Sequence, residues 1–151
     1  MEDWLAFTQA MPDLAAFGRE RLERRISYLA TLRADGSPRV HPVSPFFAGG
    51  HLYVYMEPTS PKVHDIRRDP RYALHCAISD NSGGEGEFLI SGSAREITDE
   101  ESRGGIFEGA RAAGYTPQDR YIVFEFGVTS AMATTYEGGA VNRLRWQADN
   151  Q

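Results

Sequence analysis

Cysteine is nearly absent from the sequence: Cys76 is the only one among 151 residues. A lone cysteine cannot close an internal disulfide, and a chain of this length buries a sufficient core without one, so we expect a reducing compartment, the cytoplasm. The chain also lacks an apolar run of membrane-spanning length, and its start, MEDWLAFTQAMPD, lacks the features of a secretory signal. With no internal repeat and no linker, we expect one domain over residues 1–151 and no membrane partner.

Positive charge is scarce as well, with 16 lysine and arginine residues against 21 aspartate and glutamate residues and a net charge of −5. Nucleic-acid binding requires a positive surface that displaces counterions, so we expect no nucleic-acid partner. Basic side chains are nevertheless concentrated in SPKVHDIRRDPRY, residues 60–72. Such a local patch suits a small anionic ligand, and the alternative is a solvated helix face held by salt bridges.

Familiar catalytic and metal-binding motifs are missing too. The sequence contains no G-x-S-x-G nucleophile elbow and no P-loop. The four histidines show no metal-ligand spacing such as H-x-x-x-H, so we expect no metal.

What the sequence does contain is an alternation of apolar and polar residues, the pattern of half-buried strands. Strands are predicted over residues 27–33, 38–47, 51–57, 71–78 and 87–97, with one or two more within 120–137 and a last one over 142–148. Helices are predicted over residues 12–25, 61–68 and 98–113. This count predicts a mostly β (α+β) fold, a small antiparallel barrel of six to eight strands with two or three peripheral helices.

Local signals refine three of these elements. Asp35-Gly36 predicts a tight hairpin between the first two strands. Gly92, inside a predicted strand, indicates a bulge or a sharp bend. Thr98 and Glu101 have the spacing of a capping box, which predicts that Thr98 caps the last helix.

Ser60-Pro61-Lys62 predicts the start of a short helix, with serine at the N-cap and proline in the first turn. The free N–H groups and the positive dipole end of such a start suit an anion. In the alternative reading, Ser60 only caps the helix and Lys62 points into water. Arg39 and His41 lie two apart and therefore on one face of a strand, where the alternative is again a solvated side chain. A candidate anion site without catalytic machinery fits a protein whose bound cofactor performs the chemistry.

The sequence resembles the pyridoxamine 5′-phosphate oxidase-like, FMN-binding split barrels through three stretches in order, ISYLATLRADGSPRVHPVSPFF, HLYVYMEPTSPKVHDIRRDPRYALHC and EGEFLISGSAREITDEE. The resemblance covers roughly residues 25–101 and is most specific where Ser-x-Lys follows a strand and Asp-Pro precedes the next one. It implies a homodimer of split barrels with two FMN sites at the interface.

The resemblance also implies which residues contact the cofactor. The implied phosphate ligands are Arg39, Ser60 and Lys62. The isoalloxazine ring is implied to lie along the second and third strands, near Val40, His41, Ser44, Tyr55 and Met56. Glu87 falls where relatives often carry a ring-contacting glutamine, and Trp146 is implied to reach the cofactor of the other subunit.

The sequence departs from the true oxidases at several positions. Pro61 stands where an arginine precedes the phosphate lysine, Ser44 replaces a lysine, and Met56 replaces a threonine. The Arg-x-His element that grips the vitamin phosphate is also missing near the C-terminus. We therefore do not expect oxidation of pyridoxamine phosphate itself.

Three functions remain open at this point. The first is an FMN-binding oxidoreductase that passes a hydride between the flavin and a small organic substrate or a nicotinamide. The second is a reductase dependent on the deazaflavin F420, whose acidic tail would meet Arg67, Arg68 or Arg71 unless these are surface charges. The third is a flavin- or haem-binding carrier or sensor without turnover, with His41 or His75 as a haem ligand. No catalytic residue is assigned; His41 and Tyr55 are the nearest candidates.

Overall fold

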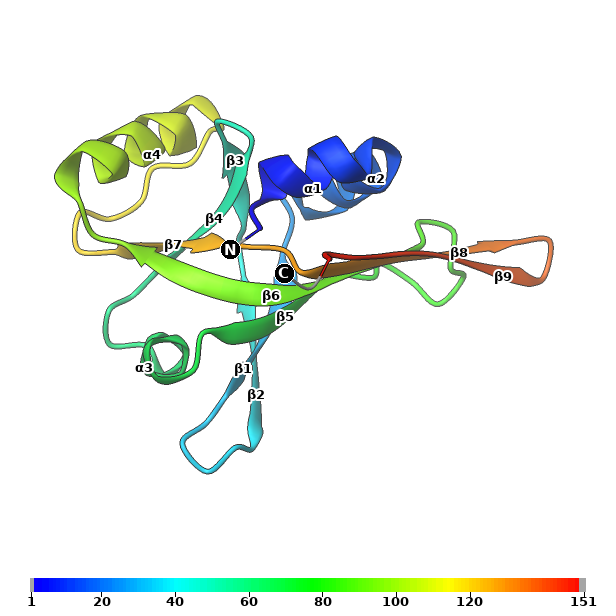
Figure 1. Ribbon diagram of the computed structural model, residues 1–151, viewed down its shortest axis with the longest axis horizontal. Coiled ribbons are helices and arrows are strands. Elements are labelled where there is room, and N and C mark those ends of the chain that lie inside the picture. Colours follow the sequence, from blue (N-terminus) through cyan, green and yellow to red (C-terminus); the bar gives the residue numbers. More distant parts are fainter. Residues whose placement is uncertain (1, 150–151) are drawn as a thin grey trace.

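The computed structural model describes residues 2–149 and places nine strands and four helices within them (Figure 1). The helices are α1 (Trp4–Ala10), α2 (Pro12–Leu22), α3 (Pro61–Arg68) and α4 (Glu100–Ala112). The strands are β1 (Ser27–Leu32), β2 (Pro38–Val43), β3 (Phe46–Ala48), β4 (His51–Met56), β5 (Arg71–Cys76), β6 (Glu87–Ile97), β7 (Ile122–Phe126), β8 (Ser130–Glu137) and β9 (Ala140–Gln147). The predicted class, a mostly β split barrel with peripheral helices, is confirmed, with one strand and one helix more than the upper ends of the predicted counts.

Every strand pairing is antiparallel, and the main order is β2-β1-β5-β6-β7-β4-β3, with β8 joined to β6 and β9 joined to β8. The long strand β6 pairs with β5 and β8 in its first part and with β7 in its second part. Gly92 lies at this transition, where a Cβ atom would come 2.2 Å from the carbonyl oxygen of Gly127. The bend predicted at Gly92 therefore depends on a close approach of two backbone segments.

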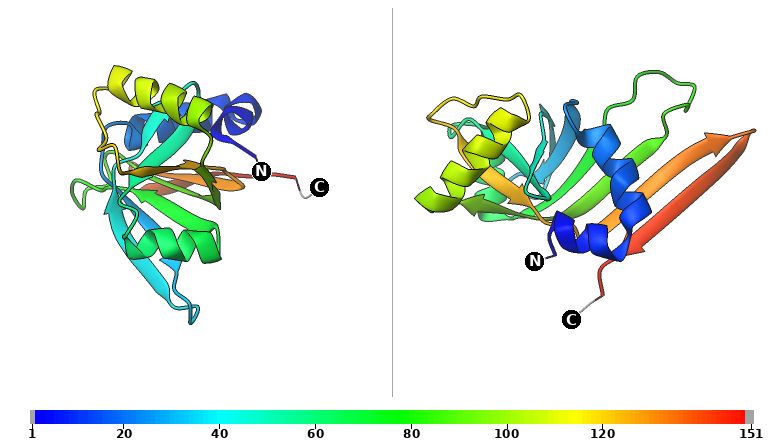
Figure 2. Two further views of the ribbon diagram at one scale, coloured as in Figure 1. Left: turned by 90° about the vertical axis from the view of Figure 1, so that its left-hand side faces the viewer. Right: turned by 90° about the horizontal axis from the view of Figure 1, so that it is seen from above.

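Two apolar clusters fill the interior. The larger is built from α1, α2 and the inward faces of both sheet halves, with Phe7, Phe88, Phe124 and Phe126 among its fully buried side chains. The smaller lies where α4 meets β3, β4 and β7 and includes Phe46, Tyr53, Ile106 and Val123. In Figures 1 and 2, α1, α2 and α4 lie on one side of β6 and β7, and α3 lies on the other side.

Three local expectations were wrong or incomplete. The predicted strand over residues 38–47 is divided at Ser44-Pro45, because proline offers no N–H to a ladder. Asp99, not Thr98, caps α4 by accepting the N–H of Ser102 at 2.9 Å. Its carboxylate also complements the helix dipole, which a threonine hydroxyl cannot do. Helix α1 was not predicted, although Asp3 caps it by accepting the N–H of Ala6 at 2.8 Å.

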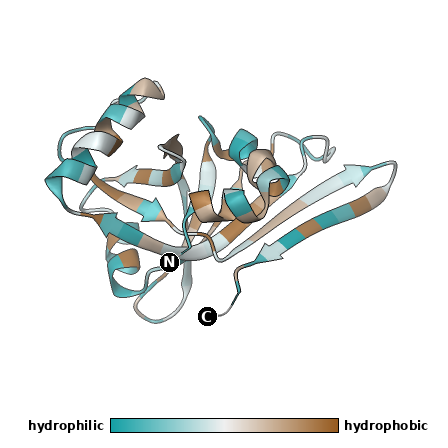
Figure 3. Cartoon of the chain, turned by 45° about the horizontal axis from the view of Figure 1, so that its top comes forward, coloured by the Kyte–Doolittle hydropathy of each residue, from teal (hydrophilic) through white to brown (hydrophobic). Residues whose placement is uncertain are grey.

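The hairpin of β8 and β9 projects from the barrel as an arm (Figure 1). Apolar and polar residues alternate along β9, as the colouring in Figure 3 shows. The face of the sheet that points away from the core carries Tyr28 and Val40, which are 47% and 62% exposed.

No helix among the described residues has the length and hydropathy needed to cross a lipid bilayer.

Candidate functional site

The start of α3 has the predicted geometry, with Ser60 at the N-cap in an extended conformation and Pro61 in the first turn. The hydroxyl of Ser60 makes no capping hydrogen bond to the helix backbone. It instead accepts a hydrogen bond from the Lys62 ammonium group at 2.9 Å. The alternative in which Ser60 merely caps and Lys62 points into water does not describe this helix start.

Lys62 is the only lysine in the 151 residues, since all other basic residues are arginine or histidine. It is half-buried, and burial lowers the pKa of its ammonium group. Within residues 2–149 it forms no ion pair with a carboxylate. A partly desolvated cation without a protein counter-ion is suited to an anionic ligand. The sequence itself carries this signal, because no other position has a lysine.

Arg39 is held against α3 by a buried carboxylate in the middle of the helix, which the sequence did not reveal. The Nε of Arg39 donates to Asp65 at 2.7 Å, and Asp65 is only 2% exposed. Asp65 also accepts from the Thr31 hydroxyl at 2.8 Å and from Arg68 at 2.9 Å. Burial raises the pKa of Asp65, but the hydrogen bonds from Arg39, Thr31 and Arg68 together outweigh it and lower the pKa. Asp65 is therefore ionised at neutral pH and fixes the Arg39 guanidinium.

His41 shares this positive environment. It lies opposite buried Leu29 in the ladder, just as Arg39 lies opposite buried Thr31, so both side chains are on the inward face of β2. Burial lowers the pKa of His41, and the charges of Lys62 and Arg39 lower it further. The imidazole is therefore neutral at pH 7, beside two cations.

The residues expected to contact the isoalloxazine ring lie on different faces of β2 and β4. Val40 is on the opposite face of β2 from Arg39 and His41, and Ser44 is exposed in the turn after β2. Met56 is 2% exposed in the main core. Tyr55 lies on the other face of β4, where it stacks on Phe46 with ring centres 5.3 Å apart. Burial raises the pKa of Tyr55, so its hydroxyl remains protonated at neutral pH.

Glu87 and Trp146 have partners outside α3 and β2 within one chain. Glu87, at the start of β6, accepts a hydrogen bond from the Tyr136 hydroxyl at 2.6 Å. Trp146 packs on Phe7 with ring centres 5.0 Å apart. The register runs from His41 through Leu29, Leu74, Ile90 and Ala131 to Trp146. Five inter-strand steps of about 4.8 Å separate His41 and Trp146 by roughly 24 Å along the curved sheet.

The family model for pyridoxamine 5′-phosphate oxidase matches residues 15–135. The chain belongs to this family. Comparison with curated proteins gave no match.

Three solved structures illustrate the range of proteins that share the fold. A pyridoxamine 5′-phosphate oxidase-related, FMN-binding protein from Nostoc punctiforme is 14% identical with a TM-score of 0.66, covering 95% of this chain and 91% of its own. An F420 reductase is 20% identical with a TM-score of 0.58, covering 75% and 94%. A haem-binding protein from Mycobacterium smegmatis is 19% identical with a TM-score of 0.63, covering 85% of this chain and 57% of its own. Such low identities establish the fold alone.

The arginines that follow Lys62 are paired with carboxylates. Arg67 binds Glu96 at 2.8 Å, and Arg71 binds its neighbour Asp69 at 2.7 Å. Arg68 belongs to the Asp65 cluster. Among residues 2–149, the basic segment of residues 60–72 therefore separates into one lysine without a carboxylate partner and three arginines in ion pairs. This favours the interpretation of these arginines as structural charges.

A hollow of about 430 Å³ opens beside Ser44. Its lining includes Arg24, Arg25, Phe46 and Tyr115. Arg25 also binds Glu85 of the β5–β6 loop at 2.9 Å. The volume lies in the range of small-molecule sites, and the walls combine aromatic rings with positive charge.

Proposed function

We propose that the protein is a cytoplasmic FMN-binding oxidoreductase in which Lys62, Ser60 and Arg39 hold the cofactor phosphate. One observation carries this assignment: the only lysine of the chain is half-buried, has no carboxylate partner in the described residues, and contacts the hydroxyl at a helix start. Lysine, hydroxyl and guanidinium donors near a helix N-terminus are the donor set that a phosphate dianion prefers. The donors present therefore fit the group.

Each residue has a distinct task in this proposal. Lys62 and Ser60 bind the phosphate, and Asp65 holds Arg39 beside α3, where its guanidinium group is the third donor. Neutral His41 is the nearest ring-side group able to donate or accept a proton. Met56 is buried, so a contact with the ring would come from its backbone. When bound, FMN supplies hydride transfer at its N5 atom to or from a small organic substrate or a nicotinamide.

We propose further that two copies associate through the outward sheet face that carries Tyr28, Val40 and Met132. On the opposite face, α2 packs on β6 and β8, and α3 packs on β1. The outward face has no such cover among the described residues, and Tyr28 and Val40 are exposed on it. In such a homodimer Glu87, which is on the same face as Tyr28, lies at the interface, whereas Trp146 is on the inward face and packs on Phe7 of its own chain. Sedimentation with bound FMN tests the proposal, and a monomer would refute it.

One feature of the structure, the hollow beside Ser44, supports the F420-dependent alternative. Arg24 and Arg25 line the hollow beside Ser44, where an acidic cofactor tail would meet positive charge. Arg25 and the three arginines after Lys62 each have a carboxylate partner, whereas Arg24 forms no ion pair among residues 2–149, so the support comes from Arg24. A carrier or sensor without turnover is the remaining alternative.

The deciding experiment is a parallel titration of the cofactor-free protein with FMN and with F420, followed by fluorescence. Lys62→Ala should weaken FMN binding by on the order of 1.5–3 kcal/mol, the usual scale of a charge-assisted hydrogen bond. Arg71→Ala, which removes an exposed charge paired with Asp69, serves as the control and should leave FMN binding unchanged. Equal FMN affinity in Lys62→Ala and the wild type would refute the phosphate assignment. Tight binding of F420 alone would favour the deazaflavin alternative, and FMN binding without reduction by any nicotinamide or organic donor would favour the carrier.

A further inference from the structure

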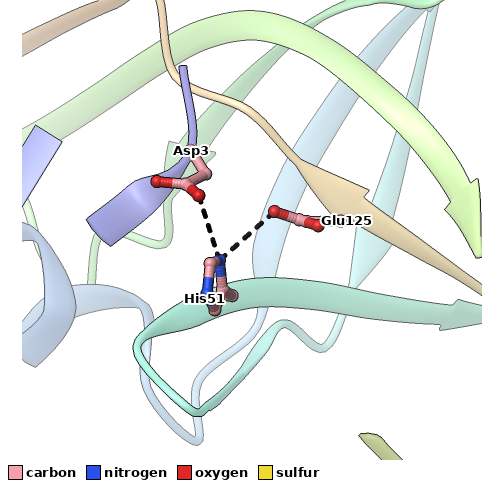
Figure 4. Close-up of side chains that lie close together, drawn as sticks. All are labelled: Asp3, His51 and Glu125. Carbon is pink, nitrogen blue, oxygen red and sulfur yellow. Dashed lines mark ion pairs between the residues drawn. The ribbon is translucent and has the colours of Figure 1, made fainter. Parts of the chain in front are cut away.

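A second cluster of polar side chains lies at the other end of β4 from α3. Asp3, His51 and Glu125 come from three segments that are distant in the sequence, the N-cap of α1, the start of β4 and the end of β7 (Figure 4). His51 and Met56, at the two ends of β4, are separated by about 17 Å of extended chain. The cluster is therefore separate from the proposed phosphate site.

The ring of His51 is directed at both carboxylates. Its Nδ1 is 3.3 Å from Oε2 of Glu125 and 3.5 Å from Oδ2 of Asp3. This nitrogen is buried and has no hydrogen-bond partner in the described part of the chain. An unsatisfied buried nitrogen between two carboxylate oxygens requires an explanation, because buried polar atoms are almost always paired.

Each carboxylate is held in place through its other oxygen. Oδ1 of Asp3 accepts the N–H of Ala6 at 2.8 Å, and Oε1 of Glu125 accepts from Arg95 at 2.7 Å. Glu125 is also 4% exposed, so its orientation is fixed by packing. These contacts leave one oxygen of each carboxylate directed at His51, as outer-shell hydrogen bonds do for metal ligands.

The spacing of the three atoms matches a metal centre. Ligands at about 2.1 Å from a tetrahedral ion lie about 3.4 Å from one another, close to both distances from Nδ1. The three ligand atoms all lie within 4.8 Å of one another. A cleft of about 330 Å³ lined by His51, Tyr53, Arg95 and Glu125 offers a path for the ion and for a fourth ligand.

We propose that Asp3, His51 and Glu125 bind one divalent transition-metal ion, with Zn²⁺ the best match to one imidazole and two carboxylates. The ion fastens α1 to the barrel, because Asp3 belongs to the helix start and the other two ligands belong to β4 and β7. The expectation of no metal rested on spacing along the sequence, and this cluster is assembled only by the fold.

The test uses the full-length protein after treatment with a chelator and desalting. Calorimetric titration with ZnCl₂ at pH 7.5 should give one site per chain, and thermal unfolding should shift upward by several degrees at saturation, because the ion binds only the folded state. MgCl₂ at the same concentration should have little effect, since Mg²⁺ prefers oxygen ligands and retains its water.

Variants locate the site. His51→Gln and Asp3→Asn should each weaken Zn²⁺ binding at least tenfold. His64→Gln, at an exposed histidine on α3, should bind Zn²⁺ as the wild type does. Asp3→Asn keeps a residue able to cap α1, so it remains informative if His51→Gln fails to fold. No Zn²⁺ binding by the wild type, or equal binding by the wild type and Asp3→Asn, would overturn the proposal.

Discussion

Arg39 on β2 and Asp65 on α3 form an ion pair of 2.7 Å whose carboxylate is almost completely buried. The pair connects the edge of the sheet to the helix that begins with Ser60. Arg39 thus has a structural partner as well as a proposed ligand. Replacing it by alanine should reduce stability as well as cofactor affinity, whereas Lys62→Ala should affect cofactor affinity with little effect on folding.

Asp65→Asn should lower the free energy of unfolding by about 3–5 kcal/mol, the usual cost of removing one partner from a buried ion pair. Urea denaturation measures the loss. Asp69→Asn, which removes an exposed partner of Arg71, is the matched control and should cost less than about 1 kcal/mol. Similar losses in the two variants would mean that the Asp65 cluster contributes no special stability.

Stability should fall as the pH is lowered below about 6.5, in part because of His41. The pKa of His41 is lowered in the folded chain, so the unfolded chain takes up a proton at this residue first. The folded state binds fewer protons in that window, and its stability therefore decreases with decreasing pH. His41→Gln should flatten the pH dependence between pH 6.5 and the folded pKa, as measured by denaturant unfolding at several pH values. An identical slope in the variant would contradict the prediction.

FMN should protect Lys62 from amine-reactive reagents. Because burial lowers the pKa of this lysine, a larger share of it is in the reactive neutral form than for an exposed lysine. A bound phosphate would raise the pKa again and cover the amine. Since Lys62 is the only lysine, mass spectrometry can compare its labelling directly with that of the α-amino group. Labelling at the same rate with and without FMN would count against the phosphate site.

Gly92→Ala should lower the free energy of unfolding by about 3 kcal/mol, the upper end of the usual cost of overpacking. The new methyl group would lie 2.2 Å from the carbonyl oxygen of Gly127, and a backbone atom cannot move aside as a flexible side chain does. Gly104→Ala, in α4 with open space around the new Cβ, is the control and should stabilise by about 0.5–1 kcal/mol. Equal thermal stability of the two variants would contradict this reading of the bend.

The sequence predicted local structure well and distant contacts poorly. Alternation located β6 at residues 87–97, and Ser60-Pro61 located the start of α3, because both signals are contained in neighbouring residues. Asp65 gave no such signal, since an aspartate in a basic helix looks like a surface charge until the fold places Arg39 and Thr31 around it. The same limit applies to His51, whose carboxylate neighbours are distant in the sequence.

The division of the ring candidates over two faces has a related cause. A resemblance assigns residues by their position along a strand, whereas Tyr55 and Met56 point to opposite sides because neighbouring strand residues alternate. Glu87 and Trp146 could not be assigned to a site by sequence reasoning either, because their distance from Lys62 depends on the width of the sheet.

The three-way pairing of β6 has a consequence for how the protein unfolds. This strand is hydrogen-bonded to β5, β7 and β8, so neither half of the barrel can separate without breaking its ladder. Loss of either half should therefore be coupled to global opening, and the slowest amide hydrogen exchange should be found in β6 on both sides of Gly92. The β8–β9 arm should exchange much faster toward its tip, where β8 is the only strand partner of β9 in the described part of the chain.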